Sequence, residues 1–116
     1  MERVEQIRLA CTLLDRIRAY LLRYEVRTWP DILAEWQTML SGVRTDVEAS
    51  AVFSHVHEGL WGMGRLADVV ISPEAGHPVT VDRDHLKSVN DEFLSLVQQL
   101  SDAVRIRVAP DDQSVR

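Results

Sequence analysis

Hydrophobic residues in the first part of the chain recur at steps of three and four residues, which is the spacing of one face of an α-helix. The stripe consists of Val4, Ile7, Cys11, Leu14, Ile17, Leu21 and Tyr24. Neither glycine nor proline interrupts residues 2–27, so one long helix is predicted there. Four further residues widen the stripe, namely Leu9, Leu13, Tyr20 and Leu22. A stripe of this width predicts that the helix packs against two neighbours.

Two shorter helices are predicted to follow. The segment Thr28-Trp29-Pro30-Asp31 is typical of a helix start, because threonine can cap free backbone N–H groups and proline fits the first turn. Gly42 predicts a left-handed end to this helix. The capping box Thr45-Asp46-Val47-Glu48 predicts a third helix that runs to about His57. The apolar positions assigned to the two helices are Ile32, Leu33, Trp36, Met39 and Leu40, then Val47, Ala51, Val52 and Val56.

A second long amphipathic helix is predicted near the end of the chain, with Asp82 or Asp84 as its cap. Its buried stripe is Leu86, Val89, Phe93, Leu96, Val97, Leu100 and Val104, and its exposed face is Lys87, Asp91, Glu92, Ser95 and Asp102. Residues 109–116 contain too little apolar surface to fold and are expected to form a flexible tail. The sequence therefore predicts an all-α fold, a single four-helix bundle-like domain over residues 1–108.

A glycine-rich bend separates the third and fourth predicted helices, with Gly59, Gly62 and Gly64 among six consecutive residues. The last two glycines flank Met63 and follow Trp61, so the backbone can turn with positive φ beside two large apolar side chains. One interpretation is a packing turn that needs glycine for close approach, and the other is a binding loop. The spacing matches neither the dinucleotide fingerprint nor a phosphate-binding P-loop.

The apolar run Leu66–Ile71 after the bend is too short for periodicity to separate helix from strand. A helical turn is predicted, because a lone strand has no partner. The alternative is a small β-hairpin over residues 69–81, in which this run pairs with Val79–Val81.

Composition and charge exclude several classes of protein. At 116 residues, 46% hydrophobic and 27% charged, the chain is typical of one ordinary globular domain. It lacks an apolar run long enough to cross a bilayer, its charged start does not resemble a signal peptide, and its single cysteine suits a reducing compartment. A cytoplasmic location without membrane attachment is therefore expected. The net charge is −5, and nine acidic residues face five basic ones after Leu66, which argues against nucleic-acid binding and favours a basic protein partner.

Candidate catalytic and metal-binding residues are few. The residues available to a small metal-dependent hydrolase are His55, His57, Asp68 and His85. His55 and His57 are two residues apart and point to different helix faces, and no His-Glu-x-x-His motif is present. Cys11 lies on an apolar stripe, where a thiol is normally inert. The sequence therefore predicts neither an enzyme nor a bound metal or other cofactor.

The motif Gly62-Met63-Gly64-x-Leu66-x-Asp68, after a helical N-terminal half with a tryptophan near its second helix, resembles a known signature. That signature, Gly-Met-Gly-Ser-x-x-Asp-Leu, belongs to a small bacterial family of unknown function, some of whose members are described as immunity proteins of toxin systems. This chain has Arg65 and Ala67 where the family more often has Ser and Asn. The resemblance implies a module that neutralises a cognate bacterial toxin by direct binding, and it supplies no catalytic residues.

The predicted partner is a basic toxin, attracted by the acidic second half of the chain. The residues assigned to the contact are Trp61, Met63, Asp68, Asp82, Asp84, Asp91 and Glu92. Trp61 is the expected anchor, because tryptophan is enriched at interaction hot spots. A homodimer that pairs through the wide stripe of the first helix is a further hypothesis.

Overall fold

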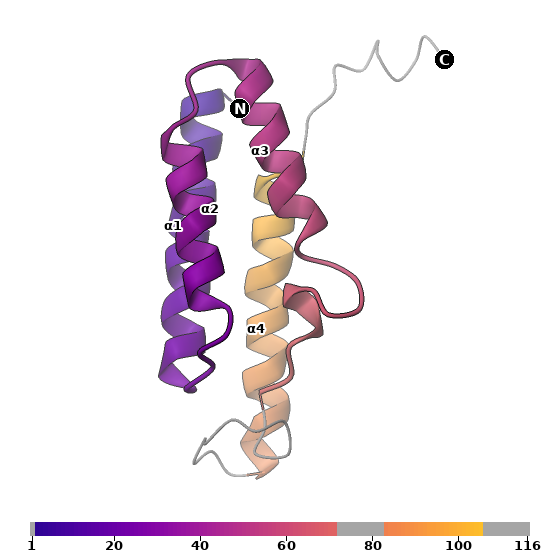
Figure 1. The fold of residues 1–116 in the computed structure, drawn as a ribbon. Helices are drawn as coiled ribbons and strands as arrows, with labels where there is room; N and C mark the ends of the chain where they lie inside the picture. Colours follow the sequence, from indigo (N-terminus) through magenta and orange to yellow (C-terminus); the bar gives the residue numbers. More distant parts are fainter. Residues whose placement is uncertain (1, 72–82, 106–116) are drawn as a thin grey trace, which may run out of the picture.

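The computed structural model describes residues 2–71 and 83–105 and contains four α-helices and one short 3₁₀ helix in these ranges. They are α1 (Arg3–Arg23), α2 (Pro30–Ser41), α3 (Asp46–Glu58), η1 (Leu66–Asp68) and α4 (Arg83–Ala103). Successive α-helices run in alternating directions (Figure 1), which is the arrangement of an up-down-up-down bundle. No strand occurs in the described ranges, and the predicted all-α bundle-like fold is confirmed.

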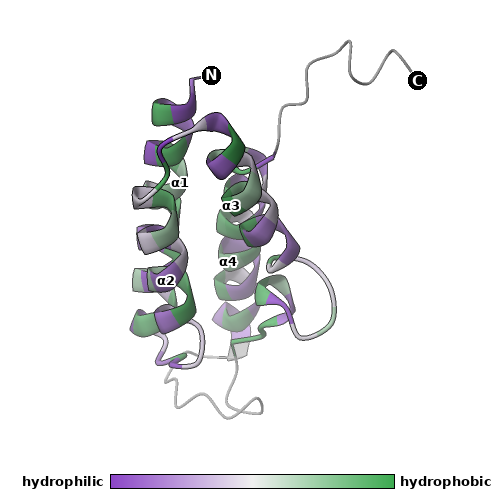
Figure 2. Ribbon diagram, turned by 45° about the horizontal axis from the view of Figure 1, so that its top comes forward, coloured by the Kyte–Doolittle hydropathy of each residue, from purple (hydrophilic) through white to green (hydrophobic). Residues whose placement is uncertain are grey.

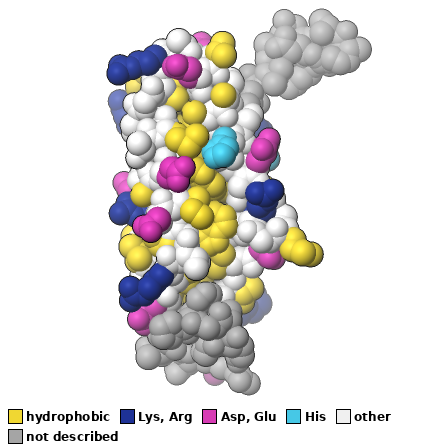
Figure 3. All heavy atoms as spheres, in the orientation of Figure 1, with side chains coloured by type: hydrophobic (Ala, Val, Ile, Leu, Met, Phe, Trp, Pro, Cys, Tyr) yellow, Lys and Arg dark blue, Asp and Glu magenta, His cyan; other side chains and the backbone are white. Residues whose placement is uncertain are grey.

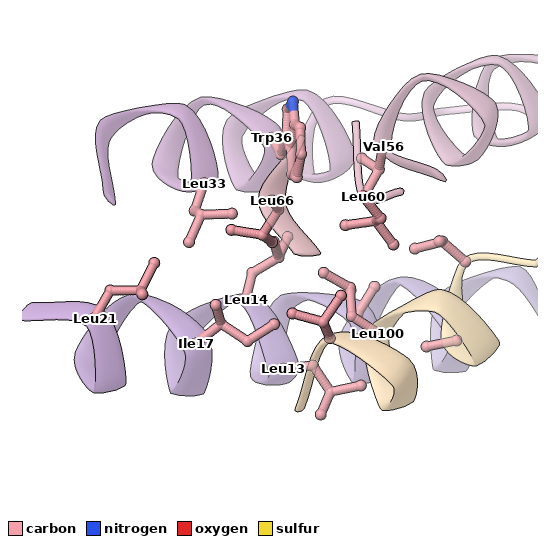
Figure 4. Packing of buried hydrophobic residues seen from close by; sticks show 14 of the residues in the cluster. Leu13, Leu14, Ile17, Leu21, Leu33, Trp36, Val56, Leu60, Leu66 and Leu100 are labelled. Carbon is pink, nitrogen blue, oxygen red and sulfur yellow. The ribbon is translucent and has the colours of Figure 1, made fainter. Parts of the chain in front are cut away.

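Helix α1 packs against both α2 and α4, as the width of its apolar stripe predicts. Apolar faces of the helices turn toward the interior of the bundle (Figure 2). In Figure 4, Leu14 and Ile17 of α1 point toward the space that Leu33 and Trp36 of α2 also enter. Three stripe residues of α1 are instead partly exposed to solvent, by 39–54%, namely Val4, Leu9 and Leu22. They lie on the flanks of a helix whose two contact surfaces are already filled by the other positions.

Polar side chains fix the register between α1 and α4 at both ends. The amide of Gln6 donates a hydrogen bond to the carbonyl oxygen of Ala103 (2.8 Å), and the hydroxyl of Tyr20 donates one to the carbonyl oxygen of Val89 (2.8 Å). Both bonds are buried, so the loss of either would leave a polar group that water cannot reach and that has no hydrogen-bond partner. The two helices are therefore held antiparallel by more than apolar contact.

Helix α1 ends at Arg23, four residues before the predicted end. The backbone N–H of Val26 bonds to the carbonyl of Leu21 (2.8 Å), and that of Glu25 bonds to the carbonyl of Leu22 (3.0 Å). This pair of bonds is a Schellman motif, in which the residue after the cap adopts a left-handed conformation. Glu25 occupies that position with φ of 60°, where glycine is usual. Because no glycine marks the site, the sequence pattern overestimates the length of the helix.

The predicted boundaries of α2 are right, but the predicted capping details are wrong. The helix begins at Pro30, so the N-cap position falls on Trp29, and Thr28 is one residue too early to cap it. No side chain caps this end. At the other end, Gly42 has φ of −89°, so the chain leaves the helix without a left-handed residue.

The capping box at the start of α3 is present as predicted, with Thr45 accepting from the backbone N–H of Glu48 (3.1 Å). The buried face of this helix differs from the prediction. Ala49, Phe53 and Val56 face the core, whereas Val47 and Ala51 are exposed. The buried residues follow steps of four and three and so form one face, from which Val47 and Ala51 are rotated away.

Helix α4 follows its predicted stripe closely, because five of the seven predicted residues are buried and Leu86 and Leu96 are half-buried. The helical turn predicted after the glycine bend is confirmed as η1. Three predictions fall on residues outside the described ranges: the capping role of Asp82, the hairpin pairing of Val79–Val81, and the tail over 109–116. Among the helices described, none has the length and apolarity needed to span a membrane.

Candidate protein-binding loop and groove

The segment between α3 and η1, residues 59–65, forms a closed loop that is here named the glycine loop. Its ends are joined because the backbone N–H of Leu66 bonds to the carbonyl of Gly59 (3.0 Å) and that of Ala67 bonds to the carbonyl of Leu60 (2.7 Å). Leu60 and Leu66 are fully buried below these bonds. The loop therefore projects from a base that is held by both hydrogen bonds and apolar packing.

The three glycines of the loop have two different roles. Gly62 and Gly64 have φ of 114° and 76°, the left-handed region that side chains disfavour, as the sequence predicts. Gly59 has an ordinary φ, but a Cβ atom there would lie 2.5 Å from Cζ2 of Trp36. The indole of Trp36 is packed into the core, so it cannot move aside cheaply. Gly59 is thus needed for close packing against Trp36, and Gly62 and Gly64 are needed for the backbone conformation of the turn.

Two side chains of the glycine loop have contrasting environments. The indole Nε1 of Trp61 donates a hydrogen bond to the buried hydroxyl of Ser101 on α4 (3.0 Å), although 40% of the Trp61 side chain remains exposed. Met63 lies at the tip and is 95% exposed. Trp61 thereby fastens the loop to the bundle while Met63 faces solvent.

Asp68, a predicted contact residue, lies in η1 and stabilises the adjoining glycine loop. Its carboxylate accepts a hydrogen bond from the backbone N–H of Gly64 (3.0 Å). The structure thus brings Asp68 of η1 against the loop that carries Trp61 and Met63, and its carboxylate helps to hold the shape of that loop.

The acidic residues of α4 are not gathered beside this loop. Asp91 forms an ion pair with Lys87 (2.6 Å), and this hydrogen bond raises the pKa of the lysine. Glu92 instead borders a groove of about 420 Å³ between α1 and α4, where Arg16 and Arg23 are its neighbours. Asp84 is exposed in the first turn of α4. Two of the four predicted steering carboxylates, Asp91 and Glu92, thus have basic neighbours within the chain.

The residues of the hydrolase hypothesis are also separated. His55 borders a pocket beside α2, His57 borders another pocket with Val104 and Arg105, and Asp68 lies in η1, where it bonds to the glycine loop. His85 lies at the start of α4. Across residues 2–71 and 83–105, no three His, Cys, Asp or Glu side chains are close enough to hold a metal ion.

The thiol of Cys11 is half-buried on α1. Burial, and secondarily the negative charge of Asp15, raise the pKa of this thiol. A raised pKa keeps the sulfur protonated at neutral pH, which makes it a poor nucleophile.

A groove between α2 and α3 is a site that the sequence analysis missed. Figure 3 shows a strip of apolar side chains down this face of the molecule. Within it lies a pocket of about 270 Å³, here named the tryptophan pocket. Its lining residues are Trp29, Ile32 and Trp36 from α2 and the turn before it, His55 and Glu58 from α3, and Gly59 and Arg65 from the glycine loop. The rings of the two tryptophans meet edge to face with centroids 6.1 Å apart.

The two helices that border this groove are uniformly acidic. Helices α2 and α3 contain no lysine or arginine, and their acidic residues are Asp31, Glu35, Asp46, Glu48 and Glu58. A comparison of the net charge of the two halves of the chain conceals the acidity of α2 and α3, because the arginines of α1 are counted in the same half. Counting charge helix by helix would have revealed it.

Two of these five carboxylates already have structural roles. Asp46 pairs with Arg3 (2.7 Å), and Glu48 accepts from the backbone N–H groups of Arg44 and Thr45. Asp31, Glu35 and Glu58 are exposed and form no ion pair within the described part of the chain. These three carboxylates therefore lack an ion-pair partner in the described residues, although Arg65 borders the same pocket as Glu58.

Comparison with known proteins gives no information about the loop or the groove, so both are interpreted from their geometry. No family model matches the chain, and neither a curated protein nor a solved structure matches it significantly. The resemblance of the Gly62–Asp68 motif to an immunity-protein family thus stays a prediction.

Proposed function

We propose that this chain is a cytoplasmic protein-binding module, specifically an immunity protein that neutralises a cognate bacterial toxin by covering part of its surface. The observation that carries the proposal is the exposure of Met63 at the tip of a loop that is fastened at its base and flank. Methionine is enriched in the cores of protein–protein interfaces, and a rigid support lowers the cost of presenting it to a partner.

The physical advantage of such a loop is that it is already ordered before binding. Hydrogen bonds at Gly59, Leu60 and Asp68 restrict the backbone, so association does not have to bear the full entropy cost of ordering it. Methionine is unbranched and polarisable, which lets it adapt to an irregular recess on the partner. Burying it completely contributes about 1.5–3 kcal/mol.

The toxin class of partner is supported by the resemblance of Gly62-Met63-Gly64-x-Leu66-x-Asp68 to the family signature and by the acidity of α2 and α3. An acidic surface accelerates encounter with a basic partner through long-range attraction. A toxin gene adjacent to the gene for this chain is the expected source of the partner.

The test is co-expression of the chain with the toxin encoded beside it, together with a binding measurement on the purified pair. The wild-type chain should restore growth and bind the toxin with one-to-one stoichiometry. Met63→Ser should weaken binding at least about tenfold, because the side chain no longer fills an apolar recess. Val47→Ser is the matched control, since Val47 is 80% exposed but lies at the start of α3.

Two results would contradict the proposal. One is full protection and unchanged affinity for Met63→Ser, which would separate the loop from binding. The other is a chain that binds no neighbouring toxin and has the native mass of a dimer, which would favour the homodimer hypothesis.

A further inference from the structure

We infer that the tryptophan pocket receives an arginine side chain of the protein partner, with Glu58 as its counter-charge. This inference deepens the proposed function, because it takes the partner to be a basic protein and assigns the contact to the groove beside the glycine loop.

The size of the pocket suits one inserted side chain. Its volume of about 270 Å³ is close to the lower end of the range of roughly 300–1,000 Å³ that ligand sites occupy. Gly59 contributes no side chain to the wall, so the recess remains open between the turn before α2 and the end of α3.

The walls favour a planar cation over an aliphatic side chain. Trp29 is half-buried and supplies most of the indole surface that the pocket exposes, while Trp36 is only 4% exposed and meets Trp29 edge to face. Tryptophan attracts a guanidinium group that lies within about 6 Å of the ring centroid, and arginine also stacks on aromatic faces. Ile32 can contact the methylene groups of an arginine stem.

Charge provides a second, independent argument. Glu58 borders the pocket and forms no ion pair within the described residues. Asp31 and Glu35 are exposed on α2, which carries no basic residue of its own. A guanidinium group in the pocket could therefore donate two N–H hydrogen bonds to the carboxylate of Glu58, while the exposed carboxylates of α2 attract it from a distance.

One residue opposes a cationic occupant. Arg65 borders the same pocket from the loop side, and its charge raises the energy of a second guanidinium. The inference consequently predicts opposite effects for the two rim residues, since removing Glu58 should weaken binding and removing Arg65 should strengthen it.

The test titrates the full chain with Nα-acetyl-arginine amide and follows the three indole N–H signals by NMR. Nα-acetyl-citrulline amide is the matched probe, because it keeps the shape of arginine and lacks its charge. The Trp29 and Trp36 signals should shift and saturate with the arginine probe. Trp61 serves as an internal control, since its indole N–H is bound to Ser101 on another face of the loop. Each signal is assigned with a Trp→Phe variant.

Two substitutions on the pocket rim make the test quantitative. Glu58→Gln should weaken binding of the arginine probe about threefold, and Arg65→Gln should strengthen it about threefold, as expected for one exposed charge pair. Both residues are exposed, so neither variant threatens the fold. Lys87→Gln, on the far helix α4, should leave binding unchanged.

Several outcomes would overturn the inference. Equal shifts with the citrulline probe would show that charge has no role, and stronger shifts with Nα-acetyl-leucine amide would assign the pocket to an apolar side chain. Absence of any shift at Trp29 and Trp36 would exclude it as an arginine site.

Failure of the proposed function looks different from failure of this inference. If no toxin binds but the arginine probe still shifts the indole signals of Trp29 and Trp36, the pocket binds arginine and the proposed toxin partner is wrong. If toxin binding depends on Met63 but is unchanged in Glu58→Gln and Arg65→Gln, the chain is a toxin-binding module but the tryptophan pocket does not receive an arginine of the toxin.

Discussion

Gly59 and Trp36 are matched so closely that a single added carbon would overlap the indole ring. A Cβ on Gly59 would lie 2.5 Å from Cζ2 and 2.7 Å from Cη2 of Trp36. This contact joins the end of α3 to the middle of α2, and it forms one wall of the tryptophan pocket. Core packing and the shape of the proposed binding groove thus depend on the same pair.

Gly59→Ala is expected to lower the free energy of unfolding by about 1–3 kcal/mol, because the rigid ring must shift within a packed core. Urea denaturation followed by circular dichroism measures this change. Gly42→Ala is the control, since Gly42 caps α2 with nearly the same backbone angles and its added Cβ would meet only ordinary contacts at 3.7 Å. Equal stabilities for the two variants would show that the indole moves without cost.

Glu25→Gly is expected to stabilise the protein by about 1 kcal/mol. Glu25 is held at φ of 60° by the Schellman motif, and a side chain in this region costs about 1–2 kcal/mol. The ion pair that Glu25 forms with Arg27 is exposed and long at 3.9 Å, so its loss matters little. Thermal unfolding of the variant should shift upward by several degrees.

The control for this prediction is Glu25→Gln, which removes the charge and keeps the Cβ atom. Its stability should remain within about 0.5 kcal/mol of the wild type. Stabilisation by glutamine as large as that by glycine would attribute the effect to charge rather than to backbone conformation.

The difference between side-chain burial and backbone conformation also explains how far the sequence could predict this fold. Helix periodicity locates the two long helices α1 and α4, because burial of one face governs each and the spacing of apolar residues records it. Helix α3 is located by its capping box instead, and its predicted apolar face is wrong in part. Predictions of helix ends fail where neighbouring segments set the backbone geometry. Glu25 adopts the left-handed conformation that glycine normally takes, whereas Gly42 does not adopt it. Local residue preferences are weak compared with the tertiary contacts that fix these turns.

The candidate site was predictable only in part. The glycine loop with Trp61 and Met63 stands out, because clustered glycines beside large apolar residues have a local signature. The tryptophan pocket has none, since Trp29, Glu58 and Arg65 come together only when α2, α3 and the loop are folded. Long-range contacts of this kind leave no periodic pattern in the chain.

Trp61 and Ser101 are expected to be energetically coupled by about 1 kcal/mol through their hydrogen bond. Single variants do not measure this, because Ser101→Ala also improves helix propensity and Trp61→Phe also changes ring size. A double-mutant cycle of Trp61→Phe and Ser101→Ala isolates the pair, and urea denaturation supplies the four free energies. Strictly additive effects would indicate that the bond does not fasten the loop.

Asp68→Ala is expected to loosen the glycine loop with little effect on global stability. The lost bond from the Gly64 N–H to the Asp68 carboxylate is exposed, so its contribution is about 0.5–1 kcal/mol. Amide hydrogen exchange should accelerate at Gly64 but not at Leu60, whose neighbours remain packed. Unchanged exchange at Gly64 would mean that the backbone turn alone maintains the loop.

Tyr20 is expected to make the protein less stable in alkaline solution. Burial, and then the charge of Glu92, raise the pKa of its hydroxyl well above the usual value of about 10. A raised folded-state pKa means that the unfolded chain releases its proton first, so stability is constant below about pH 10 and falls as the pH rises beyond it. Wild-type protein should lose about 1 kcal/mol between pH 9 and pH 11 through this group.

Tyr20→Phe provides the comparison that assigns this loss. At pH 8 the variant should be about 1 kcal/mol less stable than the wild type, because the hydrogen bond to the Val89 carbonyl is absent. As the pH rises above 10, the two stability curves should converge, since only the wild type carries the titrating Tyr20 hydroxyl. Urea denaturation at each pH measures the difference directly, and parallel curves would show that the Tyr20 hydroxyl ionises as easily in the folded protein as in the unfolded chain.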